Sequence, residues 1–142
     1  MQLPTRTLIA PLFAVLLSAI APHRLHAEVV QLQPQLSSDP IQLQGTSGGV
    51  QKSDCGSISE QPSQTLEVGQ QFPYLRLRVE SAGEPTLLIE GPTGRFCILA
   101  DSTVGEKPEM SGLWTVGTYQ IYIGDLAGGQ HSYTLSITQN PN

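Results

Sequence analysis

The chain has 142 residues and carries 12 acidic against 7 basic side chains, which gives a formal net charge of −5. Nucleic acids and anionic membrane surfaces are bound through Lys and Arg, which displace counterions, so the charge excludes both as partners. The length is that of a single domain.

The N-terminal segment reads as an export signal over residues 1–27. Arg6 supplies a positive start, residues 8–21 form an apolar run, and small residues follow. We expect cleavage after Ala27; cleavage after Ala21 is the alternative, although Pro22 would then follow the cut bond. An uncleaved membrane anchor is disfavoured, because the run is shorter than the roughly 20 residues of a spanning helix and contains Pro11. The processed chain is therefore predicted to be secreted or periplasmic, with no stable membrane insertion.

Residues 28–49 are predicted to form a flexible linker or arm. Gln, Pro, Ser and Gly dominate this segment, and its apolar residues show no sustained period. The folded domain is expected over residues 50–140.

Within that domain, short apolar runs bounded by turn residues predict strands at residues 50–58, 65–68, 74–80, 86–90 and 95–100. The clearest is 74–80, in which Leu75, Leu77 and Val79 alternate with charged residues. Between two of these strands, Gly91-Pro92-Thr93-Gly94 predicts a tight turn with Gly94 in a positive-φ conformation. Residues 101–111 show no strong pattern and are predicted to be the longest loop.

Two further alternating runs lie near the C-terminus, with Tyr119, Ile121 and Ile123 in the first and residues 133–137 in the second. The Asp-Leu-Ala-Gly-Gly cluster between them predicts a β-hairpin. About seven short strands with turns every 8–12 residues indicate an all-β fold, an antiparallel β-sandwich of the jelly-roll kind. A small closed barrel is the alternative.

Two cysteines, Cys55 and Cys97, remain in the processed chain. In an exported protein this small, even number predicts one disulfide bond. The spacing does not fit a Cys-x-x-Cys redox pair, and two Cys with one His cannot complete a structural zinc site.

Several motifs resemble those of bacterial pre-peptidase C-terminal domains and of stand-alone secreted proteins similar to them. They are Gly83-Glu84-Pro85-Thr86-Leu87-Leu88-Ile89, Gly91-Pro92-x-Gly94, Gly112-x-Trp114-x-x-Gly117-Thr118-Tyr119 and Tyr133-x-Leu135-x-Ile137. The resemblance implies a β-sandwich module attached to exported hydrolases or found alone. Members often carry acidic residues after the strand equivalent to residues 95–100, sometimes a pair. Here Asp101 stands alone, which weakens the case for a calcium site, and no cofactor is predicted.

Four side chains are predicted as ligand contacts: Trp114, Tyr122, Asp101 and Asp125. Trp114 is either a packing anchor or, with Tyr74 and Tyr122, an exposed platform for a sugar or peptide. The two acids are expected in loops or at strand ends, where carboxylates can meet a cation, but no calcium-loop spacing exists.

The pentapeptide Gly45-Thr46-Ser47-Gly48-Gly49 resembles the nucleophile loop of trypsin-like serine proteases. The one histidine of the processed chain, His131, lies at its far end, and a two-barrel protease core is far larger than this chain. We therefore interpret the pentapeptide as linker and His131 as a solvated turn residue, and no catalytic residues are predicted.

The sequence thus predicts an exported, non-enzymatic binding or accessory module that recognises a protein, peptide or polysaccharide through loops. The alternative is a structural envelope protein with no specific small ligand. In the first case Trp114, Tyr122 and the loop over residues 101–111 should form one exposed patch.

Overall fold

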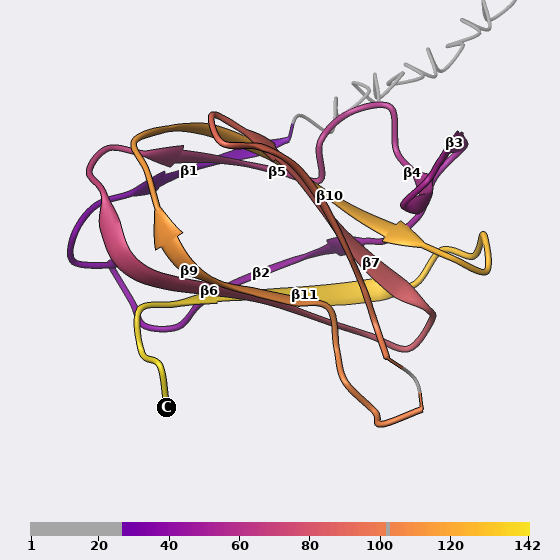
Figure 1. Ribbon diagram of the computed structural model, residues 1–142. Coiled ribbons are helices and arrows are strands. Elements are labelled where there is room, and N and C mark those ends of the chain that lie inside the picture. Colours follow the sequence, from indigo (N-terminus) through magenta and orange to yellow (C-terminus); the bar gives the residue numbers. More distant parts are fainter. Residues whose placement is uncertain (1–26, 102) are drawn as a thin grey trace, which may run out of the picture.

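The computed structural model describes residues 27–101 and 103–142, so the predicted signal at 1–27 lies outside the described residues apart from Ala27. The described residues form eleven β-strands in two layers (Figure 1). The strands are β1 Glu28–Leu32, β2 Ile41–Thr46, β3 Gln51–Ser53, β4 Gly56–Ile58, β5 Gln64–Val68, β6 Phe72–Ser81, β7 Pro85–Gly91, β8 Gly94–Leu99, β9 Glu109–Trp114, β10 Gly117–Asp125 and β11 Ser132–Thr138. Within this part of the chain, no helix is long and apolar enough to cross a membrane.

The two layers are a seven-stranded sheet, called sheet A, and a four-stranded sheet, called sheet B. Sheet A runs β1-β5-β10-β4-β3, with β7 also pairing β10 and β8 pairing β7; sheet B runs β2-β11-β6-β9. All pairings are antiparallel except that of β1 with β5. The predicted antiparallel β-sandwich is confirmed.

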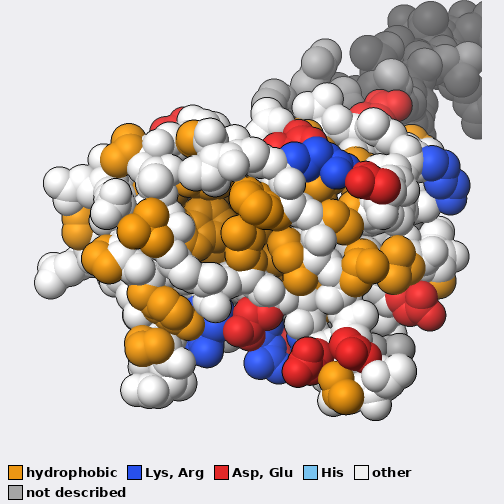
Figure 2. Space-filling view, in the orientation of Figure 1, with side chains coloured by type: hydrophobic (Ala, Val, Ile, Leu, Met, Phe, Trp, Pro, Cys, Tyr) orange, Lys and Arg blue, Asp and Glu red, His pale blue; other side chains and the backbone are white. Residues whose placement is uncertain are grey.

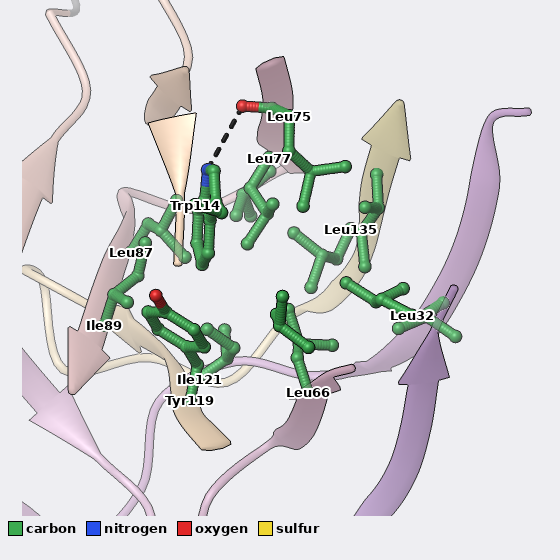
Figure 3. Close-up of a cluster of buried hydrophobic side chains, with 14 of the residues drawn as sticks. Leu32, Leu66, Leu75, Leu77, Leu87, Ile89, Trp114, Tyr119, Ile121 and Leu135 are labelled. Atoms are coloured by element: carbon green, nitrogen blue, oxygen red, sulfur yellow. Dashed lines mark hydrogen bonds between the residues drawn. The ribbon is translucent and has the colours of Figure 1, made fainter. Parts of the chain in front are cut away.

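The core lies between the sheets and is made by the alternating residues of the strands (Figure 3). Leu75, Leu77 and Val79 of β6 are fully buried against Leu87 and Ile89 of β7 and their neighbours. The intervening arginines of β6 lie on the outer face of sheet B, as predicted. Because successive side chains of a strand point to opposite faces, the alternation in the sequence was sufficient to place this strand.

The predicted C-terminal hairpin is wrong. β10 pairs with β5 and β7 in sheet A, whereas β11 pairs with β2 and β6 in sheet B. The segment between them therefore crosses from one sheet to the other, and we call residues 125–131 the arch. Each of the two strands buries one face against the opposite sheet. Their alternation of apolar and polar residues is therefore the same as that of a hairpin.

The predicted flexible arm over residues 28–49 is also wrong. It contains β1, which extends sheet A beside β5, and β2, which extends sheet B beside β11. Leu32 is fully buried and Leu43 is 9% exposed, so each strand contributes one buried side chain to the core, and Val30 and Ile41 pack against it. The folded structure thus begins with β1 at Glu28 rather than near residue 50.

Two smaller differences concern the middle of the chain. The predicted single strand at 50–58 is a tight hairpin of β3 and β4 with Cys55 in its turn. The predicted loop at 101–111 is shorter than expected, because β9 starts at Glu109. The turn between β7 and β8 is confirmed, with Gly94 at a φ of 125°.

Candidate functional site

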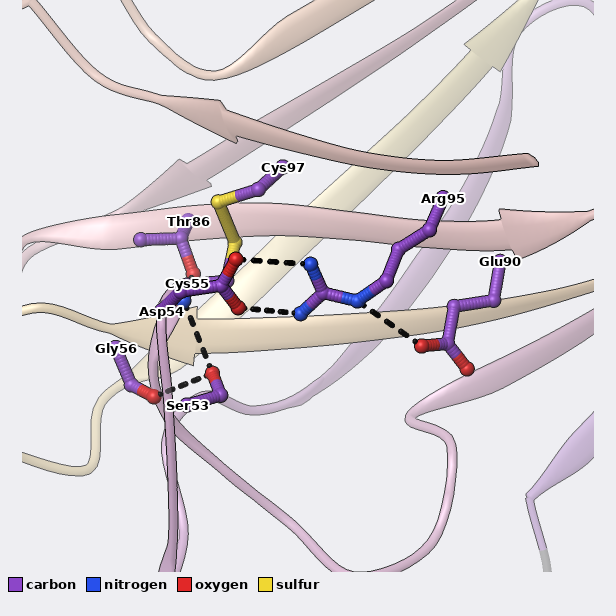
Figure 4. The surroundings of a disulfide bond; sticks show 8 residues. All are labelled: Ser53, Asp54, Cys55, Gly56, Thr86, Glu90, Arg95 and Cys97. Atoms are coloured by element: carbon purple, nitrogen blue, oxygen red, sulfur yellow. Dashed lines mark hydrogen bonds and ion pairs between the residues drawn. A yellow bond between two sulfur atoms is a disulfide. The ribbon is translucent and has the colours of Figure 1, made fainter.

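The outer face of sheet A carries the predicted disulfide. Cys55 and Cys97 are bonded, with their Cα atoms 5.7 Å apart, and join the β3–β4 turn to β8 (Figure 4). Ile58, Leu88 and Tyr122 pack around the bond in a small apolar cluster separate from the main core. A structural disulfide is typical of an oxidising, extracytoplasmic compartment.

Arg95 of β8 binds two carboxylates beside this cluster. Its Nη1 and Nη2 donate to the two oxygens of Asp54 at 3.0 and 2.5 Å, and its Nε donates to Glu90 at 3.2 Å (Figure 4). The Arg95 guanidinium lowers the pKa of Asp54 below its ordinary value. All three side chains are well exposed, so the interaction orders the surface more than it stabilises the fold.

Tyr122 lies on this outer face, as its alternation predicted. It is half-buried, and together with Leu88, Glu90 and Arg95 it lines a shallow groove of about 340 Å³. Burial, and then the nearby Glu90 carboxylate, raise the pKa of its hydroxyl. Its role as a ligand contact stays a prediction.

Trp114 is part of the main core, so of its two predicted roles the packing anchor is confirmed and the exposed platform is wrong. Its side chain is 3% exposed, its Nε1 donates to the Leu75 carbonyl at 3.2 Å, and its ring lies 4.7 Å from that of Tyr119 (Figure 3). The residue lies at the inward-facing end of β9, where the pairing with Phe72 directs it between the sheets. The patch of Trp114, Tyr122 and the 101–111 loop is therefore not formed.

Asp101 is exposed and organises its own loop. One carboxylate oxygen accepts hydrogen bonds from the Thr103 N–H at 2.9 Å and from the Thr103 hydroxyl at 2.5 Å. The Thr103 hydroxyl lowers the pKa of Asp101. These bonds are those of a local turn, which explains why an acid occurs there.

Asp125 is completely buried at the start of the arch. Its Oδ1 accepts from the N–H groups of Ala127 and Gly129 at 2.9 and 3.3 Å. Its Oδ2 accepts from the Glu84 N–H at 3.3 Å and lies 3.1 Å from the His131 Nδ1. The carboxylate therefore satisfies the backbone of the arch, and its burial leaves it out of contact with an exterior ligand.

Ser47 and His131 also meet at the arch, although not as a catalytic pair. Ser47 is fully buried, and its Oγ accepts a hydrogen bond from the backbone N–H of His131 at 3.2 Å rather than bonding the imidazole. The Ser47 N–H in turn donates to the His131 carbonyl at 2.8 Å. The protease-like pentapeptide is thus a structural element that anchors the end of β2 to the arch.

The predicted contacts consequently lie in four separate places. In the described part of the chain, no group of three His, Cys, Asp or Glu side chains could hold a metal ion.

A surface that sequence reasoning missed lies between the edge strands β8 and β9. Phe96 and Ile98 of β8 share the inner face of sheet A with Ile89 and Leu87, their partners on β7. Met110 of β9 likewise shares the inner face of sheet B with Leu77. Phe96 is 38% exposed, and Ile98 and Met110 are half-buried. Figure 2 shows apolar side chains gathered in a hollow on this side of the molecule.

We call this surface the apolar opening. A Cβ atom placed on Gly112 would meet nothing within 4 Å, which leaves space beside the Met110 side chain. Leu99 and Leu113, 50% and 60% exposed, flank the opening on the outer faces of the two strands. The alternation of Phe96 and Ile98 was visible in the sequence, but their exposure depends on β8 being an edge strand.

Comparison with known proteins identifies one relative and several similar structures. No protein-family model matches the chain. Uncharacterized protein Synpcc7942_2126 of Synechococcus elongatus is 44% identical over 102 residues, which cover 69% of this chain and 75% of the relative. The chain belongs to the same family as this protein.

Among solved structures, the pre-peptidase C-terminal domain of collagenase from Bacillus anthracis is similar with a TM-score of 0.53 at 16% identity, over 80% of this chain and 95% of that domain. PliG of Aeromonas hydrophila, a periplasmic lysozyme inhibitor of g-type lysozyme, has a TM-score of 0.49 at 16% identity, over 79% and 96%. The predicted resemblance of this chain to pre-peptidase C-terminal domains is confirmed for the fold. At this identity it extends to the fold alone.

Proposed function

We propose that this protein is a non-enzymatic binding module of the periplasm or the cell exterior, and that it binds an extended, apolar peptide segment of a partner protein at the apolar opening. The observation that carries the proposal is the exposure of Phe96, Ile98 and Met110 between two edge strands. Exposed apolar surface that is contiguous and bordered by polar residues is typical of protein interaction sites.

The backbone of the two edge strands supports a peptide ligand. Among the described residues, β8 pairs only with β7, and β9 only with β6. Each therefore presents an outer row of N–H and C=O groups that an extended chain can bind by adding a strand. Alternate side chains of such a peptide would point into the opening and cover Phe96 and Ile98.

Charged groups border one end of the opening. A pocket of about 450 Å³ is lined by Ile98 and Leu99 together with Arg78, Lys107 and Glu109. The Arg78 Nη1 lies 3.7 Å from the Glu109 Oε2. This arrangement offers a peptide polar contacts next to the apolar ones, which suits a segment with both kinds of side chain.

The proposal is tested by selecting peptides from a displayed random library against the purified protein. We expect the selected peptides to alternate apolar and polar residues. A Phe96→Glu variant should lose at least about tenfold in affinity, since an apolar side chain contributes about 1.5–3 kcal/mol when it is fully buried.

Val29→Glu is the matched control. Val29 is a 52% exposed apolar residue on the edge strand β1, at the opposite edge of sheet A, so this change introduces the same charge away from the opening. Selected peptides that bind the Phe96→Glu protein as well as they bind the Val29→Glu protein would contradict the proposal. That result would favour a structural envelope role.

A further inference from the structure

Strand β8 forms an edge of sheet A beside the apolar opening. Among the residues described it pairs with β7 alone, and this pairing is regular from Gly94 to Leu99. The pairing of the other edge strand, β9, is interrupted opposite Phe72 and Leu75 of β6. We infer that the partner protein of the apolar opening is a second copy of this chain, which adds its own β8 antiparallel to β8. The inference rests on the proposed function, because it names the partner of the same site.

The turn between β7 and β8 determines which peptide groups of β8 are free. It has two residues and is closed by the pair of Gly91 and Gly94. The closing pair of a two-residue hairpin turn exchanges hydrogen bonds, and along the ladder such pairs alternate with pairs that exchange none. Every second residue of β8 therefore turns its N–H and C=O groups away from β7. These residues are Arg95, Cys97 and Leu99.

The free peptide groups of β8 are complementary to those of a second copy. With a two-fold axis at Cys97, Arg95 of each copy lies opposite Leu99 of the other, and the two Cys97 residues lie opposite each other. Each outward-facing residue then meets another outward-facing residue, so every free N–H and C=O group of the three finds a partner. A two-fold dimer uses the same surface on both copies, so the two apolar openings face each other.

The side chains of this register also fit. Phe96 of one copy lies opposite Ile98 of the other on the inner face of the sheet, and Phe96 is 38% exposed in the single chain. These two residues form a pair without hydrogen bonds, in which facing side chains lie closest together. An aromatic side chain opposite a β-branched one is a favourable cross-strand pair. The dimer therefore covers the apolar residues that the single chain leaves exposed.

Charge does not oppose the dimer. Arg95 is the one charged residue of β8, and Asp54 and Glu90 of its own chain already neutralise it. In the proposed register it meets Leu99, which is 50% exposed in the single chain, and not the Arg95 of the other copy. Proteins protect free sheet edges with Lys, Pro or inward-pointing charges, and β8 contains none of these.

The inference is tested first on the unchanged protein, produced from its complete coding sequence and purified in the form that the cell makes. Sedimentation velocity over a concentration series should show a monomer–dimer equilibrium. We expect a dissociation constant of about 10–100 μM, because one strand pair forms a small interface.

Amide hydrogen exchange, measured by NMR on ¹⁵N-labelled protein, locates the interface. The amides of Arg95, Cys97 and Leu99 should exchange about fourfold or more slowly at about 1 mM protein than at about 20 μM, because dimerisation reduces the free monomer fraction by that factor. The Ile98 amide, which is bonded to β7 in monomer and dimer alike, is the internal control.

Two variants test the side chains and the backbone separately. Phe96→Glu places a charge in the interface and should be monomeric, whereas Val29→Glu, at the opposite edge of sheet A, should dimerise like the unchanged protein. Leu99→Pro removes an N–H group that points away from β7, so it should keep the fold and weaken the dimer at least about tenfold. The melting temperatures of the three variants report whether each is folded.

A protein that is monomeric at about 1 mM would overturn the inference, since that concentration is well above the expected dissociation constant. A dimer that protects other amides, or that persists unchanged in folded Phe96→Glu and Leu99→Pro, would also overturn it. A monomeric protein that binds the selected peptides would exclude the second copy as the partner and leave the proposed function intact. A protein that neither dimerises nor selects peptides would contradict both.

Discussion

Replacement of Asp125 should destabilise the fold more than replacement of any exposed acid. The Asp125→Ala change leaves the N–H groups of Glu84, Ala127 and Gly129 without their acceptor and removes the contact of His131. Hydrogen bonds to charged groups contribute about 1.5–3 kcal/mol each, but two of these are long at 3.3 Å and water can reach the arch. We therefore expect a loss of about 3–5 kcal/mol in the free energy of unfolding.

The Asn variant tests which oxygen matters. Asp125→Asn keeps an acceptor for Ala127 and Gly129 but turns an NH₂ group toward the Glu84 N–H, so we expect a smaller loss of about 1–2 kcal/mol. Asp101→Asn is the matched control in an exposed turn and should leave the unfolding midpoint unchanged.

The assay is urea unfolding at pH 7, followed by the fluorescence of Trp114. It is the one tryptophan of the chain and is buried in the core between the sheets, so its emission reports global unfolding. A change of midpoint at constant slope measures the stability difference. An Asp125→Ala protein within 1 kcal/mol of the unchanged protein would refute the assignment of Asp125 as the acceptor that holds the arch.

The remaining predictions concern the disulfide and the pH dependence of stability. The double variant Cys55→Ala, Cys97→Ala should unfold about 4 kcal/mol more easily, because the bond closes a loop with a sequence separation of 42. Reduction should destabilise the native protein and leave the double variant unaffected. Burial raises the pKa of Tyr133, so the stability that its neutral hydroxyl contributes is complete below the ordinary value of 10.0 and is lost as the pH rises beyond it. Melting temperatures measured across this range should fall more steeply for the native protein than for Tyr133→Phe, and equal slopes would contradict this.

The strands that could be predicted are those in which alternation coincides with complete burial. In β6, Leu75, Leu77 and Val79 are all 0% exposed while the residues between them face outward. Local periodicity shows that one face of a strand is buried. It does not show which strand covers that face, because a hairpin partner and a strand of the opposite sheet bury it equally. This is why β10 and β11 were predicted to be neighbours although they lie in different sheets.

β1 and β2 were missed because the segment that contains them is rich in Gln, Pro, Ser and Gly. β2 does alternate, with Ile41 and Leu43 toward the core and Gln42 outward, but two apolar residues among Gln and Gly resemble linker sequence. The glycine of this strand is explained only by the fold, since Gly45 makes room for the ring of Tyr133 from the neighbouring strand. A contact between residues so distant in the sequence leaves no local signal.

The candidate site was harder to predict than the fold for a related reason. A residue of β8 such as Phe96 has the same pattern as a core residue, and it becomes a surface residue only because no strand lies beyond β8. Conversely, the position of Trp114 after a glycine left both a packing anchor and an exposed platform open, and the opposite sheet covers it. Strand order, which is set by long-range pairing, thus decides which apolar side chains are available to a ligand.

The two sheets of this sandwich leave it open along two sides, and their chemistry differs because different strands form their edges. β8 and β9 bring Phe96, Ile98 and Met110 to one side, where the core itself reaches the surface. β1 and β2 bring amides and hydroxyls to the other, above Gln64 and Tyr133. A partner that covers apolar surface is therefore expected on the side of β8 and β9, and a substitution on the side of β1 and β2 should leave its affinity unchanged.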